Sequence, residues 1–267
     1  MGIASSADFA KKNTKEHLRY LLDQGLPSWD NALLSAQPSP NPLQAMNFYH
    51  LTSLLNDSLT TIPAPDTTHF HDGIKAIRLE PHLGLIRYVN RGRAWNSERD
   101  ADRDPPDLKA MPEFIAQLAN SFELNSTELK MAPARWQMAQ GSTLKASQPK
   151  ACFKMYTLAF AQRVINGVPV HQSCLSLAIN HRNQIHRLAL EWPEFRLQAG
   201  SLLSRQHIIE EALNRIEQHQ PSERLQIQAH LAYARMKDEK DYRAVVSLAI
   251  NDLPKPYRLI IPVSKSA

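Results

Sequence analysis

The sequence KMYTLAFAQRVINGVPVHQSCLSLAI, residues 154–179, decides the fold class. Its two halves are rich in the aliphatic, aromatic and β-branched residues that favour strands. Asn166-Gly167 between them is the strongest short turn signal in the chain, since both residues accept the positive φ angles of a tight hairpin. The segment therefore predicts strands at 154–160 and 168–179 that turn back on one another at Asn166-Gly167.

The surrounding sequence repeats one pattern, a helix followed by antiparallel strands. Residues 128–193 read as all-β, with a first strand around Trp136, a turn at 180–183 and a last strand at 185–192. A helix at 108–122 precedes them, with Phe114, Ile115, Leu118 and Phe122 on one side, and a strand pair at 74–89 precedes that helix. A second helix at 204–218 is followed by strands at 225–236, 242–250 and 257–263. This order predicts an α+β fold.

The first 66 residues read differently, as helical. The first helix follows Ser5 and Ser6, which are capping types, and ends at Gly25. A Ser/Pro-rich break at 35–42 leads to a second helix, which runs to about residue 59. The expected organisation is a helical N-terminal segment at 1–66, a domain at 70–200 and a helix with three strands at 204–267.

Composition limits the function classes. The 267 residues are 43% hydrophobic and 21% charged, as in globular proteins, and no apolar run is long enough to span a bilayer. The net charge is +5, yet no acidic residue occurs between Glu128 and Glu191. A stretch with basic but no acidic residues produces a positive potential, which favours an acidic partner surface. Lys and Arg residues that prevent sheet edges from pairing with other chains explain the same stretch as well. The start of the chain lacks the pattern of a signal peptide, and a trimmed signal would look the same.

Two segments resemble a known family. Residues 110–124, AMPEFIAQLANSFEL, look like the helix in the propeptides of thermolysin- and fungalysin-type metallopeptidases. Residues 163–170, RVINGVPV, followed by the apolar strand at 175–179, are similar to the strand motif of those propeptides. The region from Ser204 onward is similar to the PepSY module that follows in them. Glu123 and Asn183 depart from the family pattern, because glycine is usual at the first position and near the second.

The resemblance implies a cystatin-like fold, in which a helix is cradled by an antiparallel sheet, and a segment that inhibits a peptidase and assists its folding. His-Glu-x-x-His does not occur here. We therefore expect a stand-alone, propeptide-like binding protein, periplasmic or secreted, with a cytoplasmic location still open. It would have no catalytic residue, cofactor or metal, and its partner would be a protein with an acidic surface, such as a peptidase. The expected binding residues are Lys150, Lys154, Arg163, Asn166, Gly167, Val168 and Pro169.

Other functions stay open beside this one. Cystatin-like sheets also enclose pockets that bind ligands or host acid–base chemistry, so an enzyme or ligand-binding protein is the main alternative. His69 and His71 would share one face of a strand, as two metal ligands need, and a polar linker explains them equally well. Nucleic-acid binding is disfavoured, because strand alternation sends several aromatic side chains of the basic stretch into the core. Cys152 and Cys174 are either two small buried residues or a disulfide between neighbouring strands.

Overall fold

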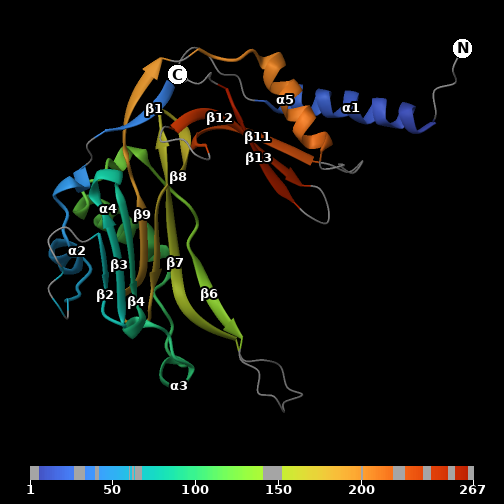
Figure 1. The fold of residues 1–267 in the computed structure, drawn as a ribbon. Coiled ribbons are helices and arrows are strands. Elements are labelled where there is room, and N and C mark those ends of the chain that lie inside the picture. The colour runs from blue at the N-terminus through green and yellow to red at the C-terminus, as the bar shows by residue number, and fades with distance from the viewer. Residues whose placement is uncertain are drawn as a thin grey trace, which may run out of the picture. The chain divides into compact units, whose positions relative to one another are not determined.

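The computed structural model describes residues 6–26, 34–39, 42–59, 61, 63, 68–140, 152–199, 201–218, 226–236, 242–251 and 256–263. The chain forms two compact units. One is Pro38–Glu194, and the other combines Met1–Gln37 with Phe195–Ala267. Helices and antiparallel strands make up both units, so the α+β class is confirmed (Figure 1).

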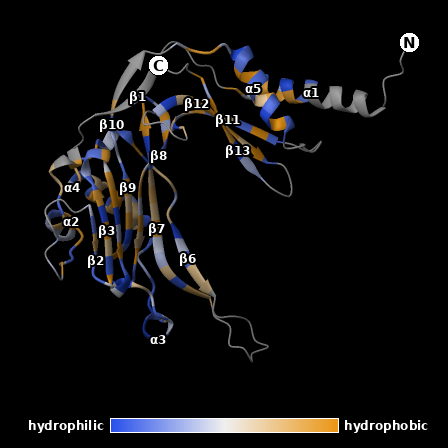
Figure 2. Cartoon of the chain, in the orientation of Figure 1, coloured by the Kyte–Doolittle hydropathy of each residue, from blue (hydrophilic) through white to orange (hydrophobic). Residues whose placement is uncertain are grey.

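An antiparallel sheet is the main element of Pro38–Glu194. Its strands follow the order β2-β3-β4-β9-β8-β7, and β5 and β6 both pair with the outer side of β7. The strands are β2 His69–His71, β3 Lys75–Glu80, β4 Leu85–Asn90, β5 Leu129–Met131, β6 Arg135–Gln140, β7 Cys152–Ile165, β8 Val168–Ile179 and β9 Ile185–Glu191. Each strand carries both hydrophobic and hydrophilic positions, as a sheet with two different faces requires (Figure 2).

The hairpin predicted at Asn166-Gly167 is confirmed. The two residues have φ angles of 50° and 82°, the left-handed values of the turn type that matches the strand twist. The predicted strand pair before the helix is also present as β3 and β4. The segment His69–His71, for which both a strand and a polar linker were open, is strand β2 with only Phe70 buried.

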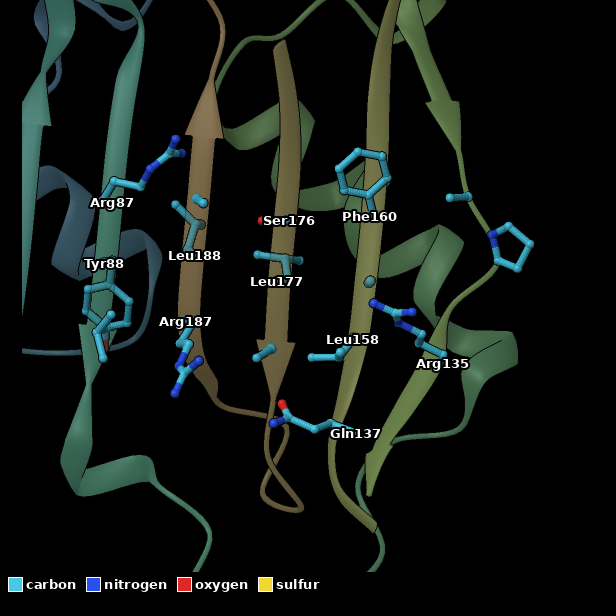
Figure 3. Close-up of a pocket in the computed structure, with 16 residues that line it drawn as sticks. Arg87, Tyr88, Arg135, Gln137, Leu158, Phe160, Ser176, Leu177, Arg187 and Leu188 are labelled. Atoms are coloured by element: carbon cyan, nitrogen blue, oxygen red, sulfur yellow. The ribbon is translucent and has the colours of Figure 1, made fainter. Parts of the chain in front are cut away.

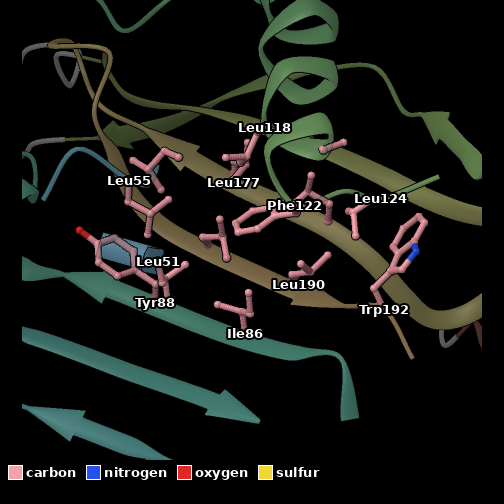
Figure 4. Close-up of a cluster of buried hydrophobic side chains, with 14 of the residues drawn as sticks. Leu51, Leu55, Ile86, Tyr88, Leu118, Phe122, Leu124, Leu177, Leu190 and Trp192 are labelled. Carbon is pink, nitrogen blue, oxygen red and sulfur yellow. The ribbon is translucent and has the colours of Figure 1, made fainter. Parts of the chain in front are cut away.

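One helix, α4 (Met111–Ser121), covers one face of this sheet, as the sequence predicted. Leu118 of α4 and the neighbouring Phe122 are buried beside Leu177 of the sheet (Figure 4). Leu175 and Ile179 belong to the same cluster, and Phe114 is half-buried at its edge. Short helices complete the unit: η1 Pro42–Ala45, α2 Phe48–Leu54, η2 Pro81–Leu83, η3 Arg91–Arg93, α3 Ser97–Asp100, η4 Leu108–Ala110 and η5 Ser126–Glu128. The predicted helix up to residue 59 is therefore shorter, and it begins at an Asn47 cap that accepts from the His50 amide.

A buried ionic cluster fastens the end of α2 to the sheet. Asp57 accepts from the hydroxyl of Tyr88 and, at 2.8 Å, from the amide of Asn90, and it lies 3.1 Å from the ammonium of Lys75. Burial raises the pKa of Asp57, but these donors outweigh burial and leave that pKa lowered. The partners of Asp57 are side chains of the sheet, so this cluster stabilises the packing of α2 on the sheet.

The second unit consists of the two chain ends. Its elements are α1 Ser6–Gly25, β1 Leu34–Ser39, β10 Glu194–Ala199, α5 Arg205–Glu217, β11 Gln226–Arg235, β12 Tyr242–Asn251 and β13 Tyr257–Pro262, with β1 and β10 crossing the unit boundaries. In it β12 pairs with β11 and β13, and α5, capped by Ser204, buries its apolar side.

The N-terminal segment at 1–66 is divided between the two units. Leu18 and Leu22 of α1 are buried, and α1 contacts α5 and β11. The guanidinium of Arg205 pairs with Asp23 at 3.2 Å, and Ala36 of β1 pairs with Tyr242 of β12. The boundary therefore falls at residues 37 and 38, because the first helix needs the C-terminal elements to bury its apolar side.

Candidate binding groove on the open sheet face

The face of the Pro38–Glu194 sheet opposite α4, called here the open face, is set by strand alternation. On β9, Leu188 and Leu190 point into the core, whereas Arg187 and Ala189 lie on the open face. Strand β7 places small residues, Ala159 and Ala161, in the core, and larger ones outside. Small side chains in the core let a helix pack closely against the sheet. The larger apolar side chains of β7 then lie on the opposite face, so the open face is partly apolar.

Strand register aligns the open-face side chains into two rows across the sheet. The first row runs from β4 to β7 as Arg87, Ala189, Ser176 and Phe160. The second row runs from β4 to β6 as Val89, Arg187, Ala178, Leu158 and Arg135.

Small side chains in the middle of both rows produce a hollow. Ala189, Ser176 and Ala178 lie at the centre, with Leu158 and Phe160 beside them. The resulting groove has a volume of about 610 Å³, and Figure 3 shows arginines on either side of it. Phe160 is 36% exposed, which is unusual for an aromatic side chain in the middle of a sheet.

The groove is basic. Among the described residues, its lining contains Arg87, Arg135 and Arg187 and no acidic residue. Arg87 shares its charge with Glu191, whose carboxylate lies 3.2 Å away, but its second terminal nitrogen is buried without a hydrogen-bond partner among the described residues. Arg135 is exposed, and no ion pair or hydrogen bond of its side chain occurs within the described ranges. The groove therefore suits an anionic ligand with apolar parts.

A neutral histidine orients the third arginine. Nδ1 of His186 donates to the carbonyl of Asn90 at 2.8 Å, so Nε2 is free to accept from Nε of Arg187 at 3.2 Å. The ring stacks on Tyr156 with centroids 4.7 Å apart. Burial lowers the pKa of His186, which keeps the ring neutral and able to accept this bond.

Of the three cations expected to face a partner, Lys154 and Arg163 do not line the groove. Lys154 pairs with Asp104 at 2.6 Å and lies over the ring of Trp136. Arg163 is only 3% exposed, so the expectation that it reaches a partner is wrong. Its guanidinium pairs with Glu128 at 2.6 Å, donates to the Pro193 carbonyl and stacks on Trp192, because β7 alternation turns it toward the core. Lys150 lies outside the described residues.

The remaining expected binding residues form the β7–β8 hairpin end. Asn166 and Gly167 are exposed in the turn, and Val168 and Pro169 are partly exposed at the start of β8. None of the four lines the groove. The structure thus separates this hairpin end from the open-face arginines.

One histidine–carboxylate pair, His181 and Asp100, lies outside the groove. His181 Nε2 lies 3.5 Å from Asp100, and both side chains are buried outside the groove and outside a second hollow of about 460 Å³ at α4. The Arg99 guanidinium lowers the pKa of Asp100 to about 2, so this carboxylate has no proton to give near neutral pH. Within the described ranges, no three His, Cys, Asp or Glu side chains are grouped to hold a metal.

The cysteines do not pair. Cys152 is exposed at the start of β7, against the expectation of a buried residue, and Cys174 in β8 is partly buried. The register places Cys174 opposite Gln162, ten residues along β7 from Cys152. Both cysteines are free. Among the described residues, no helix is both long and apolar enough to cross a membrane.

Sequence reasoning counted Arg135 and Arg187 only as members of a basic stretch, and it missed Arg87 and Phe160 as site residues. One signal for Phe160 was available in the sequence. The run at 154–160 has more large apolar residues than a strand with one solvent-exposed face needs, which indicates apolar side chains on both faces. The strand order that joins β4 to β9 was not readable, because it depends on contacts about a hundred residues apart.

The sequence was also compared with known proteins. It matches no known family model and no curated protein.

Proposed function

We propose that this chain is a non-catalytic protein-binding module that acts as an inhibitor or a folding chaperone of a secreted peptidase or of another protein partner. The groove on the open face carries this proposal, because three arginines surround an apolar floor and none of the described residues that line it is acidic. Arginine and aromatic side chains are enriched where proteins bind one another. The partner surface would be acidic, and the protein would act in the periplasm or after secretion.

The propeptide resemblance gains support from two turns. Glu123, at a glycine position of the family pattern, and Asn183, near another, have φ angles of 55° and 58°. After α4, Leu124 donates to Ala119 and Glu123 donates to Asn120, as in a helix end that normally requires glycine. Left-handed backbone at these two positions supports the proposed resemblance, because glycine favours the same conformation. A helix on an antiparallel sheet fits the cystatin-like arrangement that the resemblance implies.

The test uses the catalytic domain of a thermolysin-type metallopeptidase from the same organism. Its rate of peptide hydrolysis is measured with increasing amounts of the protein, and its recovered activity is measured after dilution from urea. We expect inhibition, improved recovery, or both. The variant Arg135→Glu/Arg187→Glu should lose the effect, whereas Arg103→Glu/Lys109→Glu, with the same charge change at exposed residues outside the groove, should keep it. No effect in either assay would exclude the peptidase partner.

A ligand-binding protein is the second candidate, because about 610 Å³ is within the usual range of about 300–1,000 Å³ for small-molecule sites. Such sites enclose most of their ligand. Here Arg135, Arg187 and Phe160 are all exposed, so the groove is open along its length. An open groove suits a chain segment that lies across it better than a small enclosed molecule.

A further inference from the structure

The spacing of the arginines carries information about the shape of the ligand. In the second row, Arg187 on β9 and Arg135 on β6 are separated by β8 and β7, hence by three strand spacings. With about 4.8 Å between neighbouring strands, the two positions lie about 14 Å apart. Ala178 and Leu158 fill the row between them.

An extended chain matches this spacing. It advances about 3.3 Å per residue, so residues i and i+4 lie about 13 Å apart, and alternation keeps i, i+2 and i+4 on one face. An α-helix advances about 1.5 Å per residue and needs about nine residues for the same distance, which places the two side chains on opposite sides of the helix. The row therefore selects an extended segment.

The floor between the two cations selects an apolar residue at the middle position. Ser176 and Ala189 leave the hollow open, and Leu158 and Phe160 offer apolar surface beside it. Arg87, whose side chain is 42% exposed, borders the same hollow from the first row. An aromatic or aliphatic side chain would cover this floor, and backbone carbonyls of the segment could accept from Arg87.

From these relationships we infer that the groove binds one extended segment of the partner protein, laid across β9, β8, β7 and β6. The segment has the pattern acidic-x-apolar-x-acidic, with its two carboxylates on Arg187 and Arg135 and its apolar side chain over Ala178 and Leu158. This inference rests on the proposed function, in that it names the feature of the protein partner that the groove recognises. It holds for any partner with such a segment, so it does not require a peptidase.

The direct test is the binding of two labelled peptides of equal composition, followed by fluorescence anisotropy. One is Gly-Thr-Glu-Thr-Phe-Thr-Glu-Thr-Gly, with the predicted spacing, and the other is Gly-Thr-Glu-Glu-Phe-Thr-Thr-Thr-Gly. We expect the first to bind at least fivefold more tightly at low salt, and the difference to shrink as salt screens the charges. Equal affinities of the two peptides would overturn the inference.

Variants assign the binding to the groove. Arg135→Glu and Arg187→Glu should each weaken the first peptide about tenfold and remove its advantage over the second. Arg135→Gln and Arg187→Gln should give smaller losses. Ser176→Phe fills the hollow without a change of charge and should also weaken binding, whereas Arg103→Glu/Lys109→Glu should leave it unchanged. Circular dichroism checks that each variant is folded, and a folded Arg135→Glu/Arg187→Glu protein with undiminished binding would refute the site.

Other anionic ligands serve as competitors. A ten-nucleotide single-stranded DNA or oleate that binds more tightly than the first peptide, and loses affinity in the same arginine variants, would overturn the inference in favour of that ligand. Because no peptidase is present in this assay, its failure and the failure of the peptidase experiment are separate results.

Discussion

The backbone of Gly84 lies directly against the carbonyl group of Trp192. The Trp192 amide donates to the Gly84 carbonyl at 2.8 Å, and a Cβ atom at position 84 would lie 2.2 Å from the Trp192 oxygen. Gly84 also has a φ of 63°, a left-handed value. This contact holds the turn between β3 and β4 against the end of β9, so it fixes the register that builds the groove.

Gly84→Ala should therefore lower the free energy of unfolding by about 3–5 kcal/mol, since left-handed strain and overlap with a backbone add together. Gly167→Ala is the matched control. Its φ is also positive, but nothing lies within 4 Å of its Cβ position, so about 1–2 kcal/mol is expected. Urea denaturation measures both variants. Equal losses would mean that the Gly84 turn can move away from Trp192.

Phe122→Ala should cost about 3–5 kcal/mol, the usual range for a buried ring. Phe122 is 1% exposed in the cluster below α4 (Figure 4). Phe114→Ala, at the half-buried edge of the same cluster, should cost less, about 1–2 kcal/mol. Chemical denaturation compares the two. A loss below about 1 kcal/mol for Phe122→Ala would show that this ring is not part of the core.

Glu123→Gly should stabilise the protein by about 0.5–1 kcal/mol. The left-handed conformation of Glu123 after α4 is strained for a non-glycine residue. The strain that glycine removes exceeds the stability lost because glycine has more backbone freedom in the unfolded chain. Ala116→Gly, at an exposed position inside α4, should instead lose about 1 kcal/mol. Thermal unfolding separates the two outcomes, and a destabilised Glu123→Gly protein would mean that the glutamate side chain contributes a contact of its own.

Arg163→Met should cost about 3–5 kcal/mol, because it leaves Glu128 without its cation in a largely buried position. The double variant Arg163→Met/Glu128→Gln should recover part of this loss, since no unpaired charge remains. A double-mutant cycle on unfolding free energies measures the coupling. If Arg163→Met costs less than about 1 kcal/mol, the pair behaves as an exposed one.

His186 should make stability depend on pH. Burial lowers the pKa of His186 below its ordinary value of 6.5, so the unfolded state binds more protons as the pH falls through that value. Neutral His186 therefore makes its full contribution to the free energy of unfolding above about pH 7. This contribution is lost as the pH falls from about 6.5 toward the pKa of His186 in the folded state. Protonation also removes the acceptor for Arg187.

The measurement is the unfolding free energy of the wild type and of His186→Gln between pH 8 and pH 5. The variant should show a smaller decrease over this range than the wild type. Parallel curves for His186→Gln and the wild type would show that His186 does not titrate differently in the folded state.

Local features of the sequence determined the elements. The Asn166-Gly167 turn, the apolar side of α4, the Ser204 cap of α5 and the three last strands depend on residues close in sequence, so they could be predicted within about two residues. The α+β class followed from their order.

Only the tertiary structure decided the site and the division of the chain. Arg163 and Arg187 belong to the same basic stretch of sequence, yet strand alternation buries the first against Glu128 and exposes the second in the groove. Arg87 and Arg135 join Arg187 only because β4, β9, β8, β7 and β6 are neighbours. Likewise α1 belongs to the C-terminal unit, since its apolar side is buried there. Pairings between distant segments depend on which packed arrangement buries the most apolar surface, and the local pattern of a chain does not contain that information.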